Sequence, residues 1–429
     1  MAPLGIGQGV RGEPTSNERK RVPLFLIAGA AVALGLLAFW AWEAYQHRVR
    51  IEGLDLRIHV NGIRGKSTVT RLLAGLLREA GYVTVAKSTG TFAAVIDPDG
   101  YDIPIIRRGP PTILEQIAVV RRHVTPDVDA LVMECMAINP IYQEVSERKI
   151  VRSTIGVLTN VREDHQDVMG ESLREIARSL MSTCPTDGIL ITAEQNPAIQ
   201  RVILREATAR GTRVVFADPT LVTEEDLARF DYIAFPDNVA IGLALARLLG
   251  IPREVAMRGM VKAPADPGVL RLRDLRIGSK RVTWANLFAV NDRESMLAAM
   301  EKLAPFRTPE TTTVGILNNR SDRERRAVQF ADVAVRDLSF DRLVTFGAFE
   351  ELVTDRLVDL GYPLDRIINL GDRRSPSLEE ILDRMVLAMP TPHVLVVGFV
   401  NIHTDQAEML MEFFEHEAEP YESSTHETS

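Results

Sequence analysis

The sequence contains only two cysteines among 429 residues, Cys135 and Cys184, and each stands in an apolar stretch. Two isolated cysteines exclude a disulfide framework and a structural zinc site built from several cysteines. Basic residues are not in excess either, because 50 Lys and Arg stand against 58 Asp and Glu, which gives a net charge of −8. A nucleic-acid binder normally shows a clustered basic face, so no nucleic-acid partner is expected.

Long uncharged runs are also scarce. With 46% hydrophobic and 25% charged residues, the composition excludes both a polytopic membrane protein and a wholly disordered chain. One stretch is different: residues 22–42 carry no charge and are about long enough to cross a bilayer as a helix. Trp40, Trp42 and Tyr45 end this stretch, as in an interfacial aromatic belt. No small-residue cleavage site follows, which favours a retained anchor over a signal peptide.

The chain between this run and its acidic end alternates between strand and helix patterns. Apolar strands are predicted at 57–60, 130–136, 154–161, 188–192 and 213–217, and again at 313–317, 343–346, 366–370 and 394–398. Helical periodicity is present at 67–79, 173–180, 239–249, 349–360 and 377–388. This alternation predicts α/β domains with mostly parallel sheets. The Pro-rich segment 262–268, KAPADPG, is the expected boundary between two of them.

The predicted organisation therefore has five parts. We expect a disordered leader, a single-pass transmembrane anchor, an ATP-binding central domain, a smaller C-terminal α/β domain and an acidic tail, at residues 1–21, 22–45, 54–266, 267–414 and 415–429.

A glycine-rich loop is the strongest chemical signal. The segment IHVNGIRGKSTVTRLL places Gly62, Gly65, Lys66 and Ser67 between a strand and a helix, although Val60 stands where the standard pattern has its first glycine. Such glycines let the backbone approach phosphate, the lysine supplies a positive charge, and Ser67 or Thr68 can bind Mg²⁺. The loop predicts a nucleotide site.

Carboxylates follow two other predicted strands. Glu134 ends the strand ALVM, where ligands of open α/β sheets bind, although a helix-capping role is the alternative. Asn160 is expected to end the next strand, and Asp164, His165 and Asp167 crowd the loop after it. These are hard ligands suited to a divalent cation.

The segments NGIRGKST, VMECM and TNVREDHQDVMGESLREIA, in this order, resemble the Mur ligases and folylpolyglutamate synthases. Together with IIRRGPPTILEQ, WANLFAVNDRES and VVGFVNIH, they are more similar still to the CapB/PgsB family, the ligase subunits of bacterial poly-γ-glutamate synthases. The resemblance runs from about residue 54 to 414. It implies a Mur-ligase-like central domain followed by a Rossmann-like C-terminal domain.

The resemblance also implies an activity and its cofactors. ATP would phosphorylate a terminal glutamate carboxylate, and the amine of an incoming glutamate would attack the acyl phosphate, with release of ADP and phosphate. By position, Lys66, Glu134 and His165 would be catalytic, with Ser67, Glu134 and His165 around Mg²⁺. The expected nucleotide contacts are Asn61, Gly62, Arg64, Gly65, Lys66, Ser67, Thr68, Asn160, Asn238 and Asn291.

Three positions depart from the wider superfamily. Leu180 stands where the Mur and folylpolyglutamate enzymes carry a carbamylated lysine, so their second metal position does not transfer. Val290 and Leu287 replace the histidine and the preceding aspartate of the C-terminal AHNP-like motif, so ribose binding by that motif does not transfer either.

For the substrate we single out Lys87, Thr89, Thr91, Arg107 and Arg108, because arginine forks match carboxylates, although paired arginines are often merely solvated.

The expected partners are glutamate, the poly-γ-glutamate chain and other membrane subunits of CapC/PgsC and CapA/PgsA type. A homo-oligomer is also compatible with the sequence. The alternatives are a folate- or peptidoglycan-type ligase and an ATP-hydrolysing subunit of an export complex. ATP use requires a cytoplasmic catalytic domain, although the lysines and arginines around the anchor slightly favour the opposite orientation.

Overall fold

The computed structural model describes residues 24–89, 93–107, 109–266, 269–288, 290, 292–371, 376–401, 404–417 and 419–420. It divides into two units, residues 1–49 and 50–429. The predicted leader, Thr91, Arg108, Asn291 and the last nine residues lie outside the described part.

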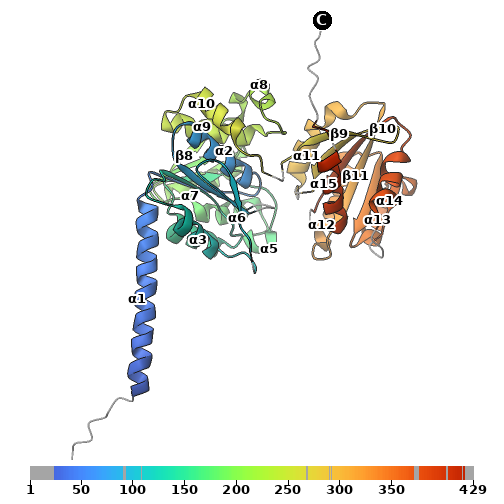
Figure 1. The fold of residues 1–429 in the computed structure, drawn as a ribbon. Coiled ribbons are helices and arrows are strands. Elements are labelled where there is room, and N and C mark those ends of the chain that lie inside the picture. The colour runs from blue at the N-terminus through green and yellow to red at the C-terminus, as the bar shows by residue number, and fades with distance from the viewer. Residues whose placement is uncertain are drawn as a thin grey trace, which may run out of the picture. The chain divides into compact units, whose positions relative to one another are not determined.

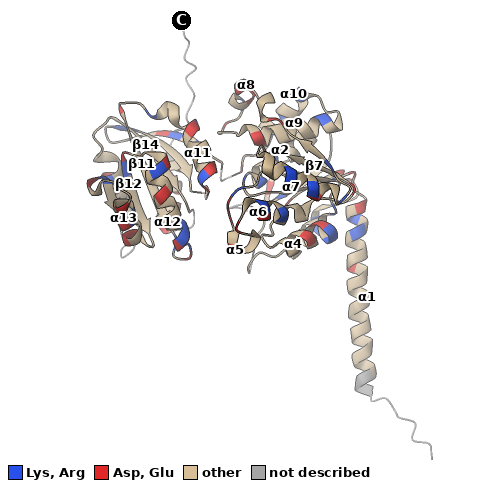
Figure 2. Ribbon diagram, turned by 180° about the vertical axis from the view of Figure 1, so that it is seen from behind, with Lys and Arg blue, Asp and Glu red and all other residues tan. Residues whose placement is uncertain are grey.

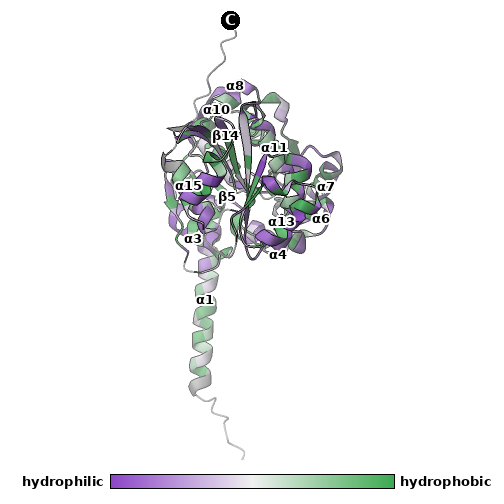
Figure 3. Ribbon diagram, turned by 90° about the vertical axis from the view of Figure 1, so that its right-hand side faces the viewer, coloured by the Kyte–Doolittle hydropathy of each residue, from purple (hydrophilic) through white to green (hydrophobic). Residues whose placement is uncertain are grey.

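The first unit consists of most of helix α1 (Leu24–Glu52). Its segment from Ile27 to Glu52 contains an 18-residue window with a mean hydropathy of 1.6, and the helix is long and apolar enough to cross a membrane. Figure 2 shows the helix almost free of charged residues until its C-terminal end, and Figure 3 shows hydrophobic residues along its length. A single N-terminal helix of this kind is compatible with the predicted anchor, and it continues seven residues past the expected end at residue 45.

The second unit contains two sheets (Figure 1). The first has the strand order β4-β3-β2-β5-β1-β6-β7-β8, in which neighbours are parallel except that β3 is antiparallel to both β2 and β4. Its strands are β1 (Leu56–Asn61), β2 (Thr84–Ser88), β3 (Ala94–Ile96), β4 (Asp102–Pro104), β5 (Ala130–Glu134), β6 (Ile155–Leu158), β7 (Ile189–Thr192) and β8 (Arg213–Phe216). Its helices are α2 (Lys66–Glu79), α3 (Leu114–His123), α4 (Pro140–Val145), α5 (Gln166–Met169), α6 (Leu173–Leu180), α7 (Pro197–Thr208), α8 (Glu224–Ala228), α9 (Pro236–Leu249) and α10 (Arg253–Lys262).

The second sheet has the order β13-β12-β11-β14-β10-β9-β15, with β9 and β15 antiparallel to their neighbours. Its strands are β9 (Leu272–Ile277), β10 (Lys280–Leu287), β11 (Thr311–Asn319), β12 (Arg342–Gly347), β13 (Ile367–Asn369), β14 (His393–Phe399) and β15 (Glu419–Pro420). Its helices are α11 (Arg293–Lys302), α12 (Glu324–Val333), α13 (Glu350–Asp359), α14 (Leu378–Leu382) and α15 (Asp405–Glu417).

Both sheets are covered on both faces, which is why central strands such as β5 and β14 are almost entirely apolar. In the first sheet, Ile58 and Val60 pack under α2, α9 and α10, whereas Leu131 and Met133 face α3 on the other side. In the second sheet, Leu317 and Val397 face α11, α12 and α13. Trp284 lies on the opposite face, where its ring stacks on that of Phe414 from α15 at 4.4 Å.

The predicted strands and helices are all present, with ends shifted by a few residues. One shift affects the site: β6 ends at Leu158, so Asn160 lies in the following loop and does not end the strand as expected. Beyond the strand end, Thr159 and Asn160 bond to the glycine-rich loop through both backbone and side chains. The helix predicted at 377–388 is α14 followed by a π-helical turn at Asp383–Leu387.

Candidate functional site: a cavity at the glycine-rich loop

The glycine-rich loop joins β1, in the middle of the first sheet, to α2. In the parallel register Val60 lies beside Glu134 of β5 and Asn61 beside Leu158 of β6, so three strand ends meet at the loop. Gly62 and Gly65 have φ angles of +135° and +78°, which residues with a side chain rarely adopt. A Cβ atom at Gly62 would lie 2.0 Å from Thr159 Oγ1, so the loop needs glycine there.

Lys66 is folded over this loop. Its Nζ donates to the carbonyl oxygens of Gly62 at 2.7 Å and Ile63 at 3.1 Å, and burial lowers the pKa of its ammonium. The Lys66 ammonium therefore lies at the centre of the bend, which is where an anion bound by such a loop needs a positive charge.

Glu134 accepts hydrogen bonds from two segments that lie more than 40 residues away from it along the chain. Ser67 Oγ donates to its Oε2 at 2.9 Å, and the backbone N–H of Thr89 donates to the same oxygen at 2.6 Å. Glu134 is 2% exposed. A hydroxyl and a carboxylate at this distance form a hard oxygen pair of the kind that Mg²⁺ prefers, so the residues present fit that ion. Among the described residues no helix-capping bond of Glu134 occurs.

His165 lies in the loop after β6 in a left-handed conformation, with φ +49°. Its Nε2 is 3.8 Å from Asp164 Oδ2, and burial lowers the pKa of the ring. No group of three His, Cys, Asp or Glu side chains that could hold a metal is present in the described part of the chain. The geometry therefore supports Ser67 and Glu134 as ligands more directly than His165.

Three of the predicted nucleotide contacts form hydrogen bonds that brace the loop. Asn160 pairs with the backbone of Arg64 in both directions, at 3.0 and 3.1 Å. Asn61 is buried, accepts the N–H of Gly62 and donates to Gln143, Thr183 and the carbonyl of Leu180. The Arg64 guanidinium is held by two carboxylates, Asp164 and Asp292, at 2.9 and 2.7 Å.

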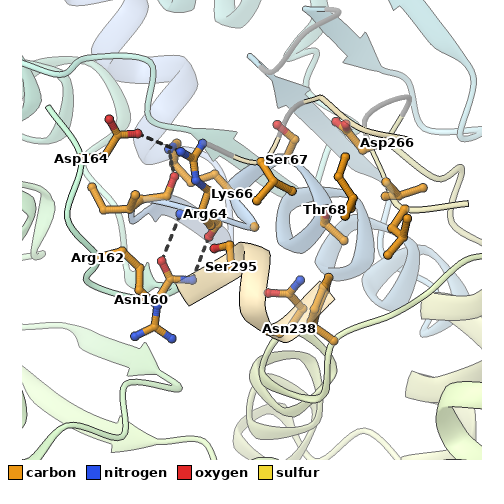
Figure 4. Close-up of a pocket in the computed structure, with 18 of the residues that line it drawn as sticks. Arg64, Lys66, Ser67, Thr68, Asn160, Arg162, Asp164, Asn238, Asp266 and Ser295 are labelled. Carbon is orange, nitrogen blue, oxygen red and sulfur yellow. Dashed lines mark hydrogen bonds and ion pairs between the residues drawn. The ribbon is translucent and has the colours of Figure 1, made fainter. Parts of the chain in front are cut away.

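A cavity of about 510 Å³ opens at the loop (Figure 4). From the first sheet's side it is lined by Lys66, Ser67, Thr68, Glu134 and Asn238. Apolar side chains such as Phe235, Leu270 and Phe288 line another part of it. The remaining wall comes from the second sheet's side, where Arg320, Arg323 and Arg326 follow the end of β11.

These three arginines were not predicted as site residues. Arg320 and Arg323 share one carboxylate, Asp322, whose side chain is 54% exposed, and Arg326 bonds to Asp164 at 3.2 Å. This wall therefore carries an excess of positive charge. The segment NNRSDRERR at the carboxyl end of a predicted strand was the signal that could have indicated it.

The predicted substrate residues lie in two different environments: Thr89 lines a cavity, whereas Lys87 and Arg107 are paired with a carboxylate. Thr89 lines a smaller cavity of about 140 Å³ beside the loop. Lys87 is fully buried, with its Nζ 2.8 Å from Glu115, and Arg107 binds the same carboxylate at 2.7 Å. Neither of these two cations lines either cavity.

Family models match both parts of the second unit. The Mur ligase middle domain matches residues 60–231, and the poly-gamma-glutamate synthase CapB C-terminal domain matches residues 272–417. Among solved structures, MurF from Acinetobacter baumannii is 15% identical with a TM-score of 0.61, covering 87% of this chain and 79% of that one. E. coli FolC in complex with ADP is 15% identical with a TM-score of 0.57, covering 87% and 92%. These likenesses establish the Mur ligase and FolC type of fold.

Two curated relatives are closer in sequence. PGA synthase CapB of Bacillus subtilis (strain 168) is 36% identical over 392 residues, which is 91% of this chain and 96% of that protein. Capsule biosynthesis protein CapB of Bacillus anthracis is 36% identical over 408 residues, covering 93% and 85%. The chain therefore belongs to the CapB family of poly-γ-glutamate synthases.

Proposed function

We propose that this chain is an ATP-dependent, ADP-forming amide ligase that joins glutamate to the end of a poly-γ-glutamate chain. The observation that carries the proposal is the composition of the large cavity: a phosphate loop with Lys66 and the Ser67–Glu134 pair on one wall, and an arginine-rich wall opposite. Phosphoryl transfer to a carboxylate and capture of a dicarboxylic amino acid need these two kinds of wall. We take residues 54–266 and 267–414 as the two domains that supply them.

On this proposal the loop holds the phosphates of ATP. Backbone N–H groups at the start of α2 and the Lys66 ammonium face the β- and γ-phosphates, while Asn238 and the apolar part of the cavity receive the adenosine. Ser67 and Glu134 would hold Mg²⁺, which neutralises developing charge on the phosphates. The γ-phosphate then faces the second wall, in line for attack by the carboxylate.

The incoming glutamate belongs to the arginine-rich wall. Its carboxylates pair with Arg320 and Arg323, because guanidinium groups bind carboxylates in two-point contacts. This holds the amine between the two walls, where it must arrive uncharged to attack the acyl phosphate. Enclosure of the cavity by the two domains keeps water from the labile intermediate.

The cellular setting follows from the anchor. We propose that α1 crosses the membrane once, that the catalytic unit is cytoplasmic because it uses ATP, and that small membrane subunits of CapC and CapA type accept the polymer. Protection of the catalytic unit from protease in intact cells is expected, whereas its digestion from outside would contradict this orientation.

The test uses the full chain in membranes with ATP, Mg²⁺ and glutamate. ADP and phosphate should form only when glutamate is present, and hydroxylamine should trap a glutamyl hydroxamate from the acyl phosphate. Lys66→Ala should lose both products, while Lys149→Ala, which changes an exposed lysine, should retain them. AMP formation would overturn phosphoryl transfer, and ADP formation that ignores glutamate would favour the export-ATPase alternative.

A further inference from the structure

Arg326 of α12 shares a carboxylate with an arginine of the phosphate loop. Its Nη2 donates to Asp164 Oδ1 at 3.2 Å. The other oxygen of Asp164 accepts from Arg64 Nη2 at 2.9 Å (Figure 4). One carboxylate therefore holds two guanidinium groups, one from the loop that is proposed to bind ATP and one from the second sheet's side of the cavity.

The shared carboxylate is itself held in place. The Asp164 side chain is 9% exposed, and its Oδ1 also accepts the N–H of His165 at 2.9 Å. Asp164 and Lys66 line the same small cavity of about 140 Å³, so the carboxylate that holds Arg326 lies near the Lys66 ammonium. This places the Arg326 guanidinium at the phosphate end of the large cavity, which Arg326 also lines.

Most of the hydrogen-bonding capacity of Arg326 is not used by the protein. Its side chain is 15% exposed, and Nη2 is the only nitrogen of its guanidinium group that donates to an acceptor within the described ranges. Arg64, by contrast, binds Asp292 through Nε and Asp164 through Nη2. A guanidinium group has five N–H donors in one plane, so Nε and Nη1 of Arg326 are available to an anion in the cavity.

The neighbouring arginines differ from Arg326 in their contacts. Arg323 lies three residues earlier and also lines the cavity, but its ion pair is with the exposed Asp322. Arg325 is exposed and does not line the cavity, although it is the adjacent residue of α12. Residues three apart share a face of a helix whereas adjacent residues do not, so Arg325 provides a matched control for Arg326.

We propose that Arg326 is a catalytic residue that donates hydrogen bonds to the phosphoryl group during its transfer, with Asp164 as the residue that positions it. This inference rests on the proposed function, because it requires the γ-phosphate of ATP at the phosphate loop. Arg320 and Arg323 hold the incoming glutamate, whereas Arg326 acts on the phosphoryl group.

The step can be written in full. A carboxylate oxygen of the chain end forms a bond to the γ-phosphorus, and the bond from that phosphorus to the bridging oxygen breaks. ADP leaves with the electron pair of the broken bond, and an acyl phosphate remains. Charge on the phosphoryl oxygens is redistributed in the transition state, where a fixed guanidinium group stabilises it more than in the ground state.

The first experiment measures glutamate-dependent phosphate release by the full chain in membranes. Arg326→Ala should lower kcat by roughly a hundredfold or more, with little change in KM for ATP or glutamate, because the lost interaction is made in the transition state. Arg325→Ala should behave like the natural chain. Added guanidinium chloride should partly restore kcat to Arg326→Ala and should not stimulate the natural chain.

The second experiment does not depend on amide formation. It measures binding of a fluorescent ADP analogue to the full chain with and without orthovanadate, which imitates a phosphoryl group in transfer. Vanadate should tighten ADP binding to the natural chain and to Arg325→Ala. Arg326→Ala should bind ADP alone as the natural chain does, but it should lose the tightening.

An Arg326→Ala chain with unchanged kcat and an unchanged vanadate effect would overturn the inference. So would a purely bracing role, in which Asp164→Asn reproduces the whole defect and guanidinium restores nothing. If Arg326→Ala does not fold, Arg326→Lys decides, because lysine keeps a charge for Asp164 but lacks the planar fork, and retention of the vanadate effect would contradict us. Phosphate release that ignores glutamate in the natural chain would instead refute the proposed function, and the vanadate measurement would still test Arg326.

Discussion

Arg64 of the phosphate loop donates through Nε to Asp292 Oδ2 at 2.7 Å, and Asp292 is the residue that caps α11 by accepting the N–H of Ser295. Asp292 is 2% exposed, and Arg64 also binds Asp164. The loop proposed to bind ATP is thereby tied to the segment that opens α11 of the second sheet. We expect the Arg64–Asp292 pair to couple nucleotide binding to the arrangement of the two walls.

A double-mutant cycle tests this coupling. Arg64→Gln and Asp292→Asn should each lower kcat/KM for ATP, and the double variant should lose less than the sum, because a buried pair commonly couples by about 1–3 kcal/mol. Asparagine retains an acceptor for the α11 cap. The exposed pair of Arg293 and Asp337 is the control and should couple weakly. Additive losses at Arg64 and Asp292 would contradict the coupling.

Glu134→Gln should weaken the response to Mg²⁺. The amide keeps the size of the side chain and its bond to Ser67 but removes the charge that attracts the ion. We expect the half-saturating Mg²⁺ concentration to rise by about tenfold or more, with activity partly recovered at high Mg²⁺. Glu144→Gln, which changes an exposed carboxylate, serves as the control. An unchanged Mg²⁺ curve would remove Glu134 from the metal site.

Arg323→Ala should raise the KM for glutamate more than it lowers kcat. Loss of one charge-assisted hydrogen bond costs about 1.5–3 kcal/mol, which corresponds to roughly a tenfold to hundredfold change in KM. ATP binding should change little, because Arg323 follows β11 of the second sheet and none of its described ion pairs involves the phosphate loop. Arg258→Ala, at a partly exposed arginine paired with Glu79, should leave both constants unchanged. A selective effect on ATP would reassign the arginine wall to the nucleotide.

Stability should fall at alkaline pH through His59. Its pKa is raised from 6.5 to about 9 by Cys135 and Glu147, so its contribution is complete below about pH 6.5 and is lost as pH rises through 9. At 1.36 kcal/mol per unit, the loss is on the order of 3 kcal/mol. Denaturant unfolding of the natural chain and of His59→Gln between pH 6 and 10 should converge as pH rises. Curves that stay parallel would contradict the assignment.

Sequence reasoning succeeded where the signal is local. The strand, the glycines and the amphipathic helix of the phosphate loop are contiguous, so their arrangement follows from chain geometry. It also anticipated that Glu134 and Ser67 share one edge of a sheet, since both follow parallel strands, and their 2.9 Å contact agrees with that expectation.

Sequence reasoning could not supply side-chain partners that lie far away along the chain. The sequence predicted Lys87 as a substrate cation, but in the structure its Nζ lies 2.8 Å from Glu115. The Asn61 side chain donates hydrogen bonds to Gln143 and Thr183, which lie far along the chain. Arg320 and Arg323 were missed for the same reason, because only the packing of the second sheet beside the loop places them in the cavity. Residue type alone does not distinguish a bracing side chain from one that binds a ligand.

Leu180 extends this point beyond the cavity. Its side chain is buried in an apolar cluster, and its carbonyl oxygen accepts from Asn61, which holds the first glycine of the phosphate loop. A leucine has no amine that could take up carbon dioxide, so this position cannot carry the carbamate that the resemblance to Mur ligases would lead one to expect here. The bonds that run from Leu180 through Asn61 to Gly62 are neutral hydrogen bonds, so this side of the loop is held without a charged group.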